Sequence, residues 1–147
     1  MLRNLLLALT LIVSPLAMAQ ATSEPQRFGD LLVYRTLFNS SFLQPDVAAN
    51  TGLERGPNVG VINLLVQRQT PQGPVHVDAN VRGTVRNMLG QSQDLDFIRI
   101  QEDEAIYFVA NYRSNQRGVL RFTVTVQGEE GGPEHEMQFH QEFHPDD

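Results

Sequence analysis

The chain has 147 residues, a formal net charge of −6 and no cysteine, which fits one domain and excludes disulfides, thiolate metal ligands and thiol nucleophiles. Its 11 basic residues are all arginine, so lysine Schiff bases, lysine general bases and P-loops are excluded. The excess of acidic residues repels phosphate backbones and leaves no basic stripe, so we expect no nucleic-acid partner.

The first 19 residues have the pattern of a secretory signal peptide. Arg3 supplies a positive start, residues 5–13 an apolar run, and Ala17-Met18-Ala19 a small-x-small cleavage site. We therefore expect cleavage after Ala19, a mature chain beginning at Gln20, and a periplasmic location, with secretion as the alternative. An apolar run of about ten residues is too short to span a bilayer, so no membrane span is expected.

A linker-like segment at residues 20–26 precedes one predicted domain at residues 27–147. Within the domain, short runs of alternating apolar and polar residues are separated by glycine, proline, asparagine and aspartate. This pattern is typical of an antiparallel β-sandwich, here with about seven strands. The predicted strands cover residues 31–38, 59–66, 75–86, 95–100, 106–112, 120–127 and 136–144.

Three of these segments carry further information. Residues 59–66 are apolar on both faces, which predicts a central strand covered on two sides, with a short helix as the candidate cover. Pro45, Asp46 and Gly52 are typical of the start, first turn and end of that helix, over residues 45–51. The alternation slips by one residue within 95–100, which predicts a bulge or twist.

The histidines near the C-terminus suggest a metal site. His140 and His144 share one face of the last predicted strand, but at about 3.3 Å per residue they lie roughly 13 Å apart, too far to share one ion. A metal or small-ligand site of His76, His140 and Glu142 stays open as an alternative. The simpler interpretation is a solvated polar strand face, with His135 half-buried and residues 145–147 a frayed acidic tail.

Two acidic groups are candidates for acid and base chemistry, Asp94 with Asp96 and the run 102–104. Acidic residues are common at strand turns for solubility, and nothing in the sequence marks either group as part of a cleft. No serine lies in a G-x-S-x-G or S-x-x-K motif. We therefore expect no catalytic residue, no cofactor and no enzyme activity.

The segment from Phe38 to Pro45 is the candidate partner-binding site. Short polar residues stand between two phenylalanines at the end of a predicted strand, so they could offer hydrogen bonds beside apolar anchors. The alternative is a strand-to-helix corner, in which the polar groups bond the backbone and the rings fill the core. The residues predicted to bind a partner are Phe38, Asn39, Ser40, Ser41 and Phe42.

Segments in the N-terminal half also carry a family resemblance. They are Phe28-Gly29-Asp30, Tyr34, Phe38 to Leu43, Pro45 to Ala48, Gly52 to Arg55 and Asn58 to Asn63. Through them the chain resembles the domain-of-unknown-function family 4426, a family of small exported bacterial proteins, over nearly the whole mature sequence. The resemblance implies an immunoglobulin-like β-sandwich. It implies no established activity and no catalytic residue.

Export, strand alternation and missing catalytic motifs together favour a non-catalytic module that binds a protein or assists one. The expected partner is an unidentified periplasmic protein or ligand, bound at the Phe38 to Pro45 segment or by strand addition along residues 134–144. The acidic face of that last strand discourages uncontrolled pairing. The metal or small-ligand site of His76, His140 and Glu142 is the competing hypothesis.

Overall fold

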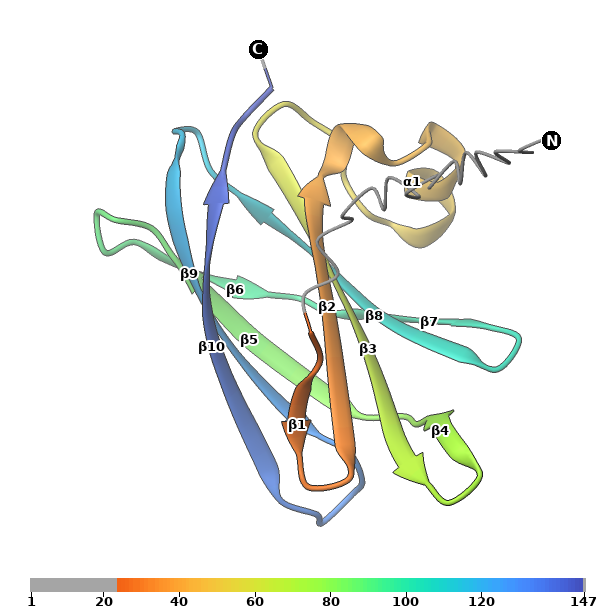
Figure 1. Ribbon diagram of the computed structural model, residues 1–147. Coiled ribbons are helices and arrows are strands. Elements are labelled where there is room, and N and C mark those ends of the chain that lie inside the picture. Colours follow the sequence, from red (N-terminus) through yellow and green to blue (C-terminus); the bar gives the residue numbers. More distant parts are fainter. Residues whose placement is uncertain (1–23, 147) are drawn as a thin grey trace, which may run out of the picture.

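The computed structural model describes residues 24–146, which Figure 1 shows as two layers of strands with one short helix, α1, at one end. The predicted signal peptide, its cleavage site and Gln20 lie outside the described residues. No helix in the part that the structure describes is long and apolar enough to cross a membrane.

Two antiparallel sheets make up the domain. Sheet A has the order β1-β2-β3-β8-β7, with β4 also paired to β3, and sheet B has the order β10-β9-β5-β6. The elements are β1 (Gln26–Phe28), β2 (Leu31–Asn39), the 3₁₀ helix η1 (Ser40–Phe42), α1 (Pro45–Thr51), β3 (Val59–Thr70), β4 (Gly73–His76), β5 (Asn80–Arg86), β6 (Ser92–Leu95), β7 (Ile98–Glu102), β8 (Ala105–Arg113), β9 (Gly118–Gln127) and β10 (Glu134–Phe143).

The strand order is that of an immunoglobulin-like sandwich. That fold places strands A, B, E and D in one sheet and strands G, F and C, with C′ in the variable type, in the other. In chain order, β2, β3, β5, β6, β7, β8, β9 and β10 correspond to A, B, C, C′, D, E, F and G. The predicted all-β, immunoglobulin-like antiparallel sandwich with one short helix is therefore confirmed.

The predicted strand at 75–86 is divided in the structure. β4 pairs with β3 in sheet A, and the chain then crosses at residues 77–79 so that β5 pairs with β9 in sheet B. Val75 of β4 is exposed, but from the crossover onward the apolar residues of this run face the space between the sheets: Val77, Ala79 and Val81 all pack against the main core. The alternation of apolar and polar residues therefore continues through the crossover. For this reason the sequence pattern does not show that the strand is divided.

The predicted strand at 95–100 is likewise divided, into β6 and β7. Leu95 pairs with Gly83 in sheet B, whereas Ile98 pairs with Val109 in sheet A. The prediction of a bulge is therefore wrong: the slip in alternation marks the point where the chain changes sheet. These two divisions and β1, whose first residue Gln26 was expected to end the linker, account for the strands beyond the predicted number.

The main core lies between the sheets and is centred on aromatic rings. Tyr112 packs edge-on against Phe122 and Phe143, with ring centroids 5.1 and 5.6 Å apart, and Phe122 stacks on Phe139 at 5.0 Å. Tyr112 fits because β3 has no side chain at Gly60. A Cβ at Gly60 would lie 2.2 Å from Cζ of the tyrosine ring.

A second, smaller core lies on the outer face of sheet A. Val61 of β3 is buried there with Leu53 and Val109, and Phe38, Leu43, Ile98 and Ile100 pack against them. The opposite face of β3 is buried in the main core through Ile62, Leu64 and Val66. The prediction of a central strand covered on both sides is confirmed, since β3 lies between β2 and β8.

Helix α1 has the predicted bounds. Pro45 occupies its first turn with Asp46, and Gly52 ends it in the left-handed conformation at φ 80°, where its N–H donates to the Ala48 carbonyl at 3.0 Å. Ala48 is the buried residue of the helix. The outer core is therefore covered mainly by the residues that flank α1, and only in part by the helix itself.

Candidate functional site

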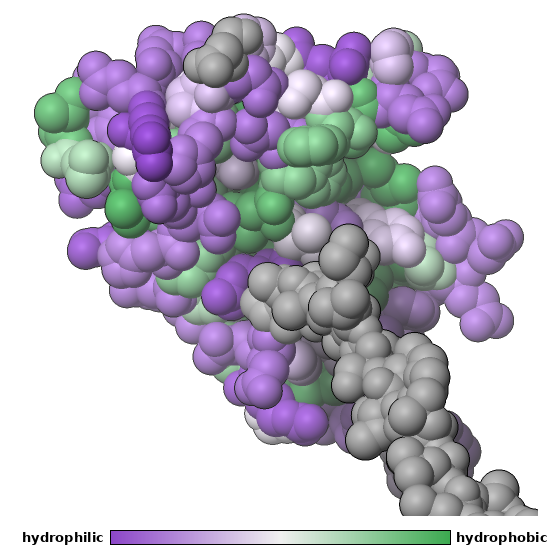
Figure 2. Space-filling view, turned by 45° about the horizontal axis from the view of Figure 1, so that its top comes forward, coloured by the Kyte–Doolittle hydropathy of each residue, from purple (hydrophilic) through white to green (hydrophobic). Residues whose placement is uncertain are grey.

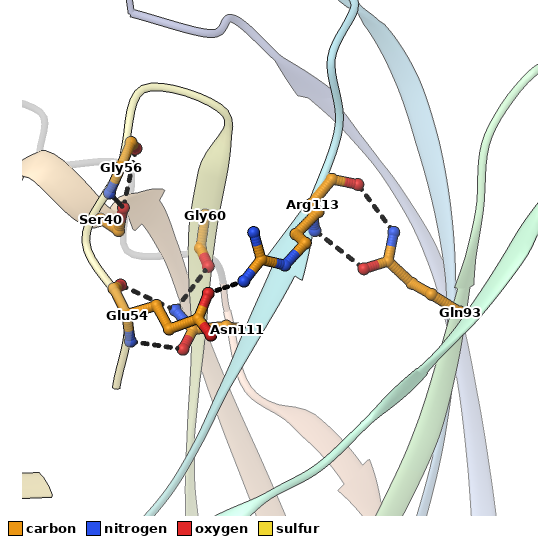
Figure 3. Close-up of polar contacts among 7 residues, drawn as sticks. All are labelled: Ser40, Glu54, Gly56, Gly60, Gln93, Asn111 and Arg113. Atoms are coloured by element: carbon orange, nitrogen blue, oxygen red, sulfur yellow. Dashed lines mark hydrogen bonds and ion pairs between the residues drawn. The ribbon is translucent and has the colours of Figure 1, made fainter. Parts of the chain in front are cut away.

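The corner segment, defined as residues 39–58, connects β2 to β3 and contains η1 and α1. Ser40 is fully buried, and its hydroxyl donates to the Gly56 carbonyl and accepts from the Gly56 N–H, both at 3.0 Å. This exchange joins the start of the corner segment to its end. Figure 3 shows the pair at one side of the polar network described below.

Asn39 binds the C-terminal tail. Its Nδ2 donates to the His144 carbonyl at 2.8 Å and to Asp146 Oδ1 at 3.0 Å, while the Asp146 N–H donates to the Pro57 carbonyl at 2.8 Å. Hydrogen bonds from Ser41 and from Asn39 lower the pKa of the Asp146 carboxyl. The expectation of a frayed tail is therefore wrong for Asp146, because side chains of the corner segment hold it.

The predicted partner-binding residues thus divide into two kinds. Asn39, Ser40 and Ser41 use their side chains within the protein, as the corner alternative predicts, although their partners are distant in sequence. Phe38 packs into the outer core. The Phe42 ring, in contrast, is largely open, at 78% exposure. Figure 2 shows hydrophobic residues in green among the hydrophilic surface of the molecule.

A polar network connects the corner segment to β8 (Figure 3). Asn111 of β8 accepts from the Glu54 N–H at 2.8 Å and donates to the carbonyls of Glu54 and Gly60, at 3.2 and 3.3 Å. The Glu54 carboxylate forms an ion pair with Arg113 at the end of β8. Gln93 of β6 then exchanges hydrogen bonds with the Arg113 backbone at 2.7 and 2.8 Å, which ties sheet B to sheet A.

An open groove begins where this network ends. This end groove is a cavity of about 630 Å³ between the β5–β6 hairpin and the β8–β9 connection, lined by residues within 87–93 and by residues 113–120. Figure 1 shows the hairpin projecting from the sandwich on the side away from α1. Met88 and Leu89 at its tip are 74% and 72% exposed, and Val119 is also exposed.

The loops around the end groove are held by their own polar groups. Asn87 Oδ1 accepts from the N–H groups of Leu89 and Gln91, both at 3.0 Å, and the Ser114 hydroxyl donates to the Gln116 carbonyl at 2.8 Å. Such bonds fix the turns and leave the Met88 and Leu89 side chains in solvent. Sequence reasoning identified both turns, but it did not treat the apolar pair between Asn87 and Gly90 as a site.

The residues of the metal hypothesis lie apart. His76 is on β4 of sheet A, whereas His140 is on β10 of sheet B, where its Nε2 accepts from Arg121 Nε at 3.2 Å. Glu142 lies 3.7 Å from Arg117 and 3.5 Å from His144. Within residues 24–146, no three histidine, aspartate or glutamate side chains form a group that could hold a metal ion.

The acidic candidates for acid and base chemistry are all exposed. Asp94 and Asp96 lie at the end of β6, and residues 102–104 form the β7–β8 turn, where Asp103 has φ 53°. An exposed carboxylate is solvated in its charged form and lacks the desolvation that prepares a catalytic acid. The structure therefore gives neither group the environment that catalysis would need.

An antiparallel immunoglobulin-like sandwich with an open groove at one end is the class of protein that these features define. The chain belongs to the DUF4426 family, a domain of unknown function, whose family model matches residues 25–146. It is similar to the crystal structure of a DUF4426 family protein from Pseudomonas aeruginosa PAO1, with 38% identity, 87% of this chain and 99% of that chain covered, and a TM-score of 0.75. The predicted family resemblance is confirmed.

Two structures of FetP from uropathogenic Escherichia coli strain F11 share the fold. The as-isolated protein, expressed in the periplasm of E. coli BL21(DE3), is 11% identical over 83% of this chain and 93% of its own, with a TM-score of 0.60. A copper-bound variant is 9% identical over 84% and 96%, with a TM-score of 0.61. At this identity the likeness concerns the fold alone. None of the curated proteins compared with the chain matches it.

Proposed function

We propose that this protein is an exported, non-catalytic binding module that holds a segment of a partner protein in the end groove. The observation that carries the proposal is the exposure of Met88 and Leu89, at 74% and 72%, beside a cavity of about 630 Å³. Adjacent apolar side chains at a rigid hairpin tip stay in contact with water in the free protein. A partner that covers them gains hydrophobic free energy.

The position of the groove in the fold supports the proposal. Loops at the end of a β-sandwich vary without disturbing the core, and a rigid scaffold positions them for recognition. Here Gln93 and Asn87 fix the two walls through backbone hydrogen bonds. The polar lining offers hydrogen bonds to a peptide backbone, while Met88 and Leu89 contact an apolar side chain.

The location and the lack of catalysis are part of the proposal. The signal-peptide pattern in residues 1–19 supports export to the periplasm. The exposure of Asp94, Asp96 and residues 102–104 supports a module without acid and base chemistry.

The copper named for the FetP variant suggests metal binding as a second candidate. Nothing in the described geometry favours it, because His76 and His140 lie in different sheets and no metal-binding group forms within residues 24–146. Calorimetry with zinc and copper on tag-free protein tests it directly. Saturable heat at micromolar metal would favour metal binding over the groove proposal.

Site-specific photo-crosslinking in the native periplasm tests the groove. The probe replaces Leu89 at the hairpin tip, and in separate strains it replaces Ser41 of the corner segment, Gln138 of β10, or Glu104 of the β7–β8 turn as the exposed control. We expect one recurring adduct from Leu89 that is missing from Glu104 and that Met88→Ser reduces. The same adducts from Leu89 and Glu104, or an adduct from Ser41 or Gln138 alone, would overturn the proposal.

A further inference from the structure

The outer face of sheet B carries three basic side chains in one row across three strands. Arg86 of β5 lies directly opposite Arg121 of β9, and Arg121 lies directly opposite His140 of β10. Directly opposed residues have Cβ atoms about 5 Å apart, so each neighbouring pair in the row starts from adjacent points of the sheet. All three residues are exposed.

Within residues 24–146, the two arginines have no carboxylate partner. Among the described residues, Arg68, Arg82, Arg99, Arg113 and Arg117 each form an ion pair with an aspartate or glutamate. Neither Arg86 nor Arg121 forms one within residues 24–146. The protein has 17 acidic and only 11 basic residues, yet two arginines are cross-strand neighbours here. A pair of like charges on neighbouring strands repels, whereas an acidic neighbour would stabilise an arginine.

The hydrogen bonds of the two arginines leave the terminal NH₂ groups of both guanidinium groups available to a ligand. Arg86 Nε donates to the Gly90 carbonyl at 3.2 Å, and Arg121 Nε donates to His140 Nε2 at 3.2 Å. These bonds orient each guanidinium through Nε. The terminal NH₂ groups, which form the bidentate contact to a carboxylate or phosphate, have no hydrogen bond to a residue of the described chain.

We propose that Arg86, Arg121 and His140 form a binding site for an oxyanion of the phosphate class on the outer face of sheet B. Two planar forks on adjacent strands match the several oxygens of a tetrahedral anion, and the bound charge offsets the repulsion between the arginines. None of the three residues lines the end groove, although Arg86 bonds Gly90 of the hairpin that walls it. Phosphate binding is measured without the groove partner, so the two proposals are tested separately.

The neighbouring row defines the limits of the site. Thr84 and Thr123 lie opposite each other one row away and line a shallow hollow with Asp94, which pairs with Thr84. The two hydroxyls can donate to an anion that extends from the arginines. Asp94 is the acidic residue of this hollow nearest the row, and its charge weakens the binding of an anion.

Titration with inorganic phosphate, followed by amide NMR at constant ionic strength, tests the site. We expect shifts along β9 and β10 around Arg121 and His140, binding about tenfold weaker in Arg121→Gln or Arg86→Gln, and tighter binding in Asp94→Asn. Arg99→Gln is the matched control, since Arg99 lies on sheet A and is paired with Asp78 at 3.0 Å. Equal shifts with chloride, or equal weakening in Arg99→Gln, would overturn the proposal.

Thermal unfolding separates binding from a loss of structure. Without phosphate, Arg121→Gln should unfold at the wild-type temperature or above it, because a like-charge contact is removed. At the same phosphate concentration, the Tm of Arg121→Gln should rise by less than the wild-type Tm. Co-sedimentation with phosphatidylcholine vesicles containing phosphatidylglycerol identifies the source: Arg121-dependent sedimentation indicates a lipid phosphate, and binding of inorganic phosphate alone indicates a free anion. A wild-type Tm that does not respond to phosphate would contradict the site.

Discussion

Gly60 is the residue at which the core depends most on a missing side chain. A Cβ there would lie between 2.2 and 2.6 Å from three atoms at the end of the Tyr112 ring, and this ring is itself packed between Phe122 and Phe143. We therefore expect Gly60→Ala to reduce the free energy of unfolding by about 3 kcal/mol, as measured by urea denaturation.

Gly56→Ala is the matched control, because its Cβ would meet a single atom, Val59 Cγ2, at 3.4 Å. It should change stability by less than about 1 kcal/mol. In the double variant Gly60→Ala with Tyr112→Leu, the loss should be smaller than the sum of the two single losses, because the overlapping ring is gone. Strict additivity would show that the cost of Gly60→Ala does not come from Tyr112.

Ser40 and its neighbour Ser41 form a natural pair for a second test. The Ser40 hydroxyl is buried and satisfies both backbone groups of Gly56, so Ser40→Ala should cost about 2 kcal/mol in urea denaturation. Ser41 is exposed, and Ser41→Ala should have little effect on global stability. Equal costs for the two variants would contradict the structural role assigned to Ser40.

Tyr112 makes the folding stability of the protein sensitive to alkaline pH. Burial raises the pKa of its phenol to about 12 from an ordinary 10.0, because the phenolate loses its hydration. Because the folded pKa is raised, the stability from the buried neutral phenol is complete below pH 10 and is lost as the pH rises toward 12. Tyr112→Phe should show a smaller fall in stability over this window, followed by circular dichroism in urea. Parallel curves for both proteins would refute the assignment.

At the scale of the elements, periodicity predicted the strands that stay within one sheet. β8 and β9 keep one face buried along their length, so their alternation reports their environment faithfully. The runs at 75–86 and 95–100 do not, because each crosses from one sheet to the other. In the first run the residues at the crossover keep facing the main core, so the binary pattern shows no break. In the second run the inward residues change from the main core to the outer core, and this change appears only as the slip in alternation.

The attachment of the C-terminal tail is the element-scale contact most sensitive to acid. The pKa of the Asp146 carboxyl is lowered, first by Ser41 and then by Asn39, so its stabilising effect is present above the ordinary value of 3.8 and is lost as the pH falls through the folded value. Asp146→Asn should imitate the acidic state at neutral pH. We expect faster hydrogen exchange at the Asp146 amide, which donates to the Pro57 carbonyl, and unchanged exchange in the core strands.

Asn39→Ala should have the same local effect, since Asn39 Nδ2 also holds the His144 carbonyl. Asp46→Asn in α1 is a control with the same change of charge in the same end of the molecule. If exchange at the amide of residue 146 stays slow in Asp146→Asn, the backbone bond to Pro57 is sufficient to hold the tail.

At the scale of the whole molecule, the groove could not be read from the sequence because its walls come from separate connections. Residues 87–93 and 113–120 meet only after β5 and β6 pair in sheet B and β8 joins sheet A. Turn residues predicted each loop but not their proximity. The corner segment shows the opposite case, because its polar residues were predicted as a candidate site. The structure shows that they bond Gly56 and the C-terminal tail, and these distant partners could not be identified from the sequence.

The exposed edge of β10 controls whether the molecule stays separate from other copies of itself. Among the strands that the structure describes, β10 pairs with β9 alone. The outer-face residues of β10 are all exposed: Glu134, Glu136, Gln138, His140 and Glu142. Charged residues on an edge strand oppose pairing with a second chain, because pairing would bring like charges together.

We expect Glu136→Val with Gln138→Val to increase self-association, measured by size-exclusion chromatography with light scattering. Thr123→Val with Thr125→Val is the control, since these residues lie on the same face of β9, which is paired on both sides. Greater association in the β9 variant would mean that apolar surface, and not an unprotected strand edge, drives the contact.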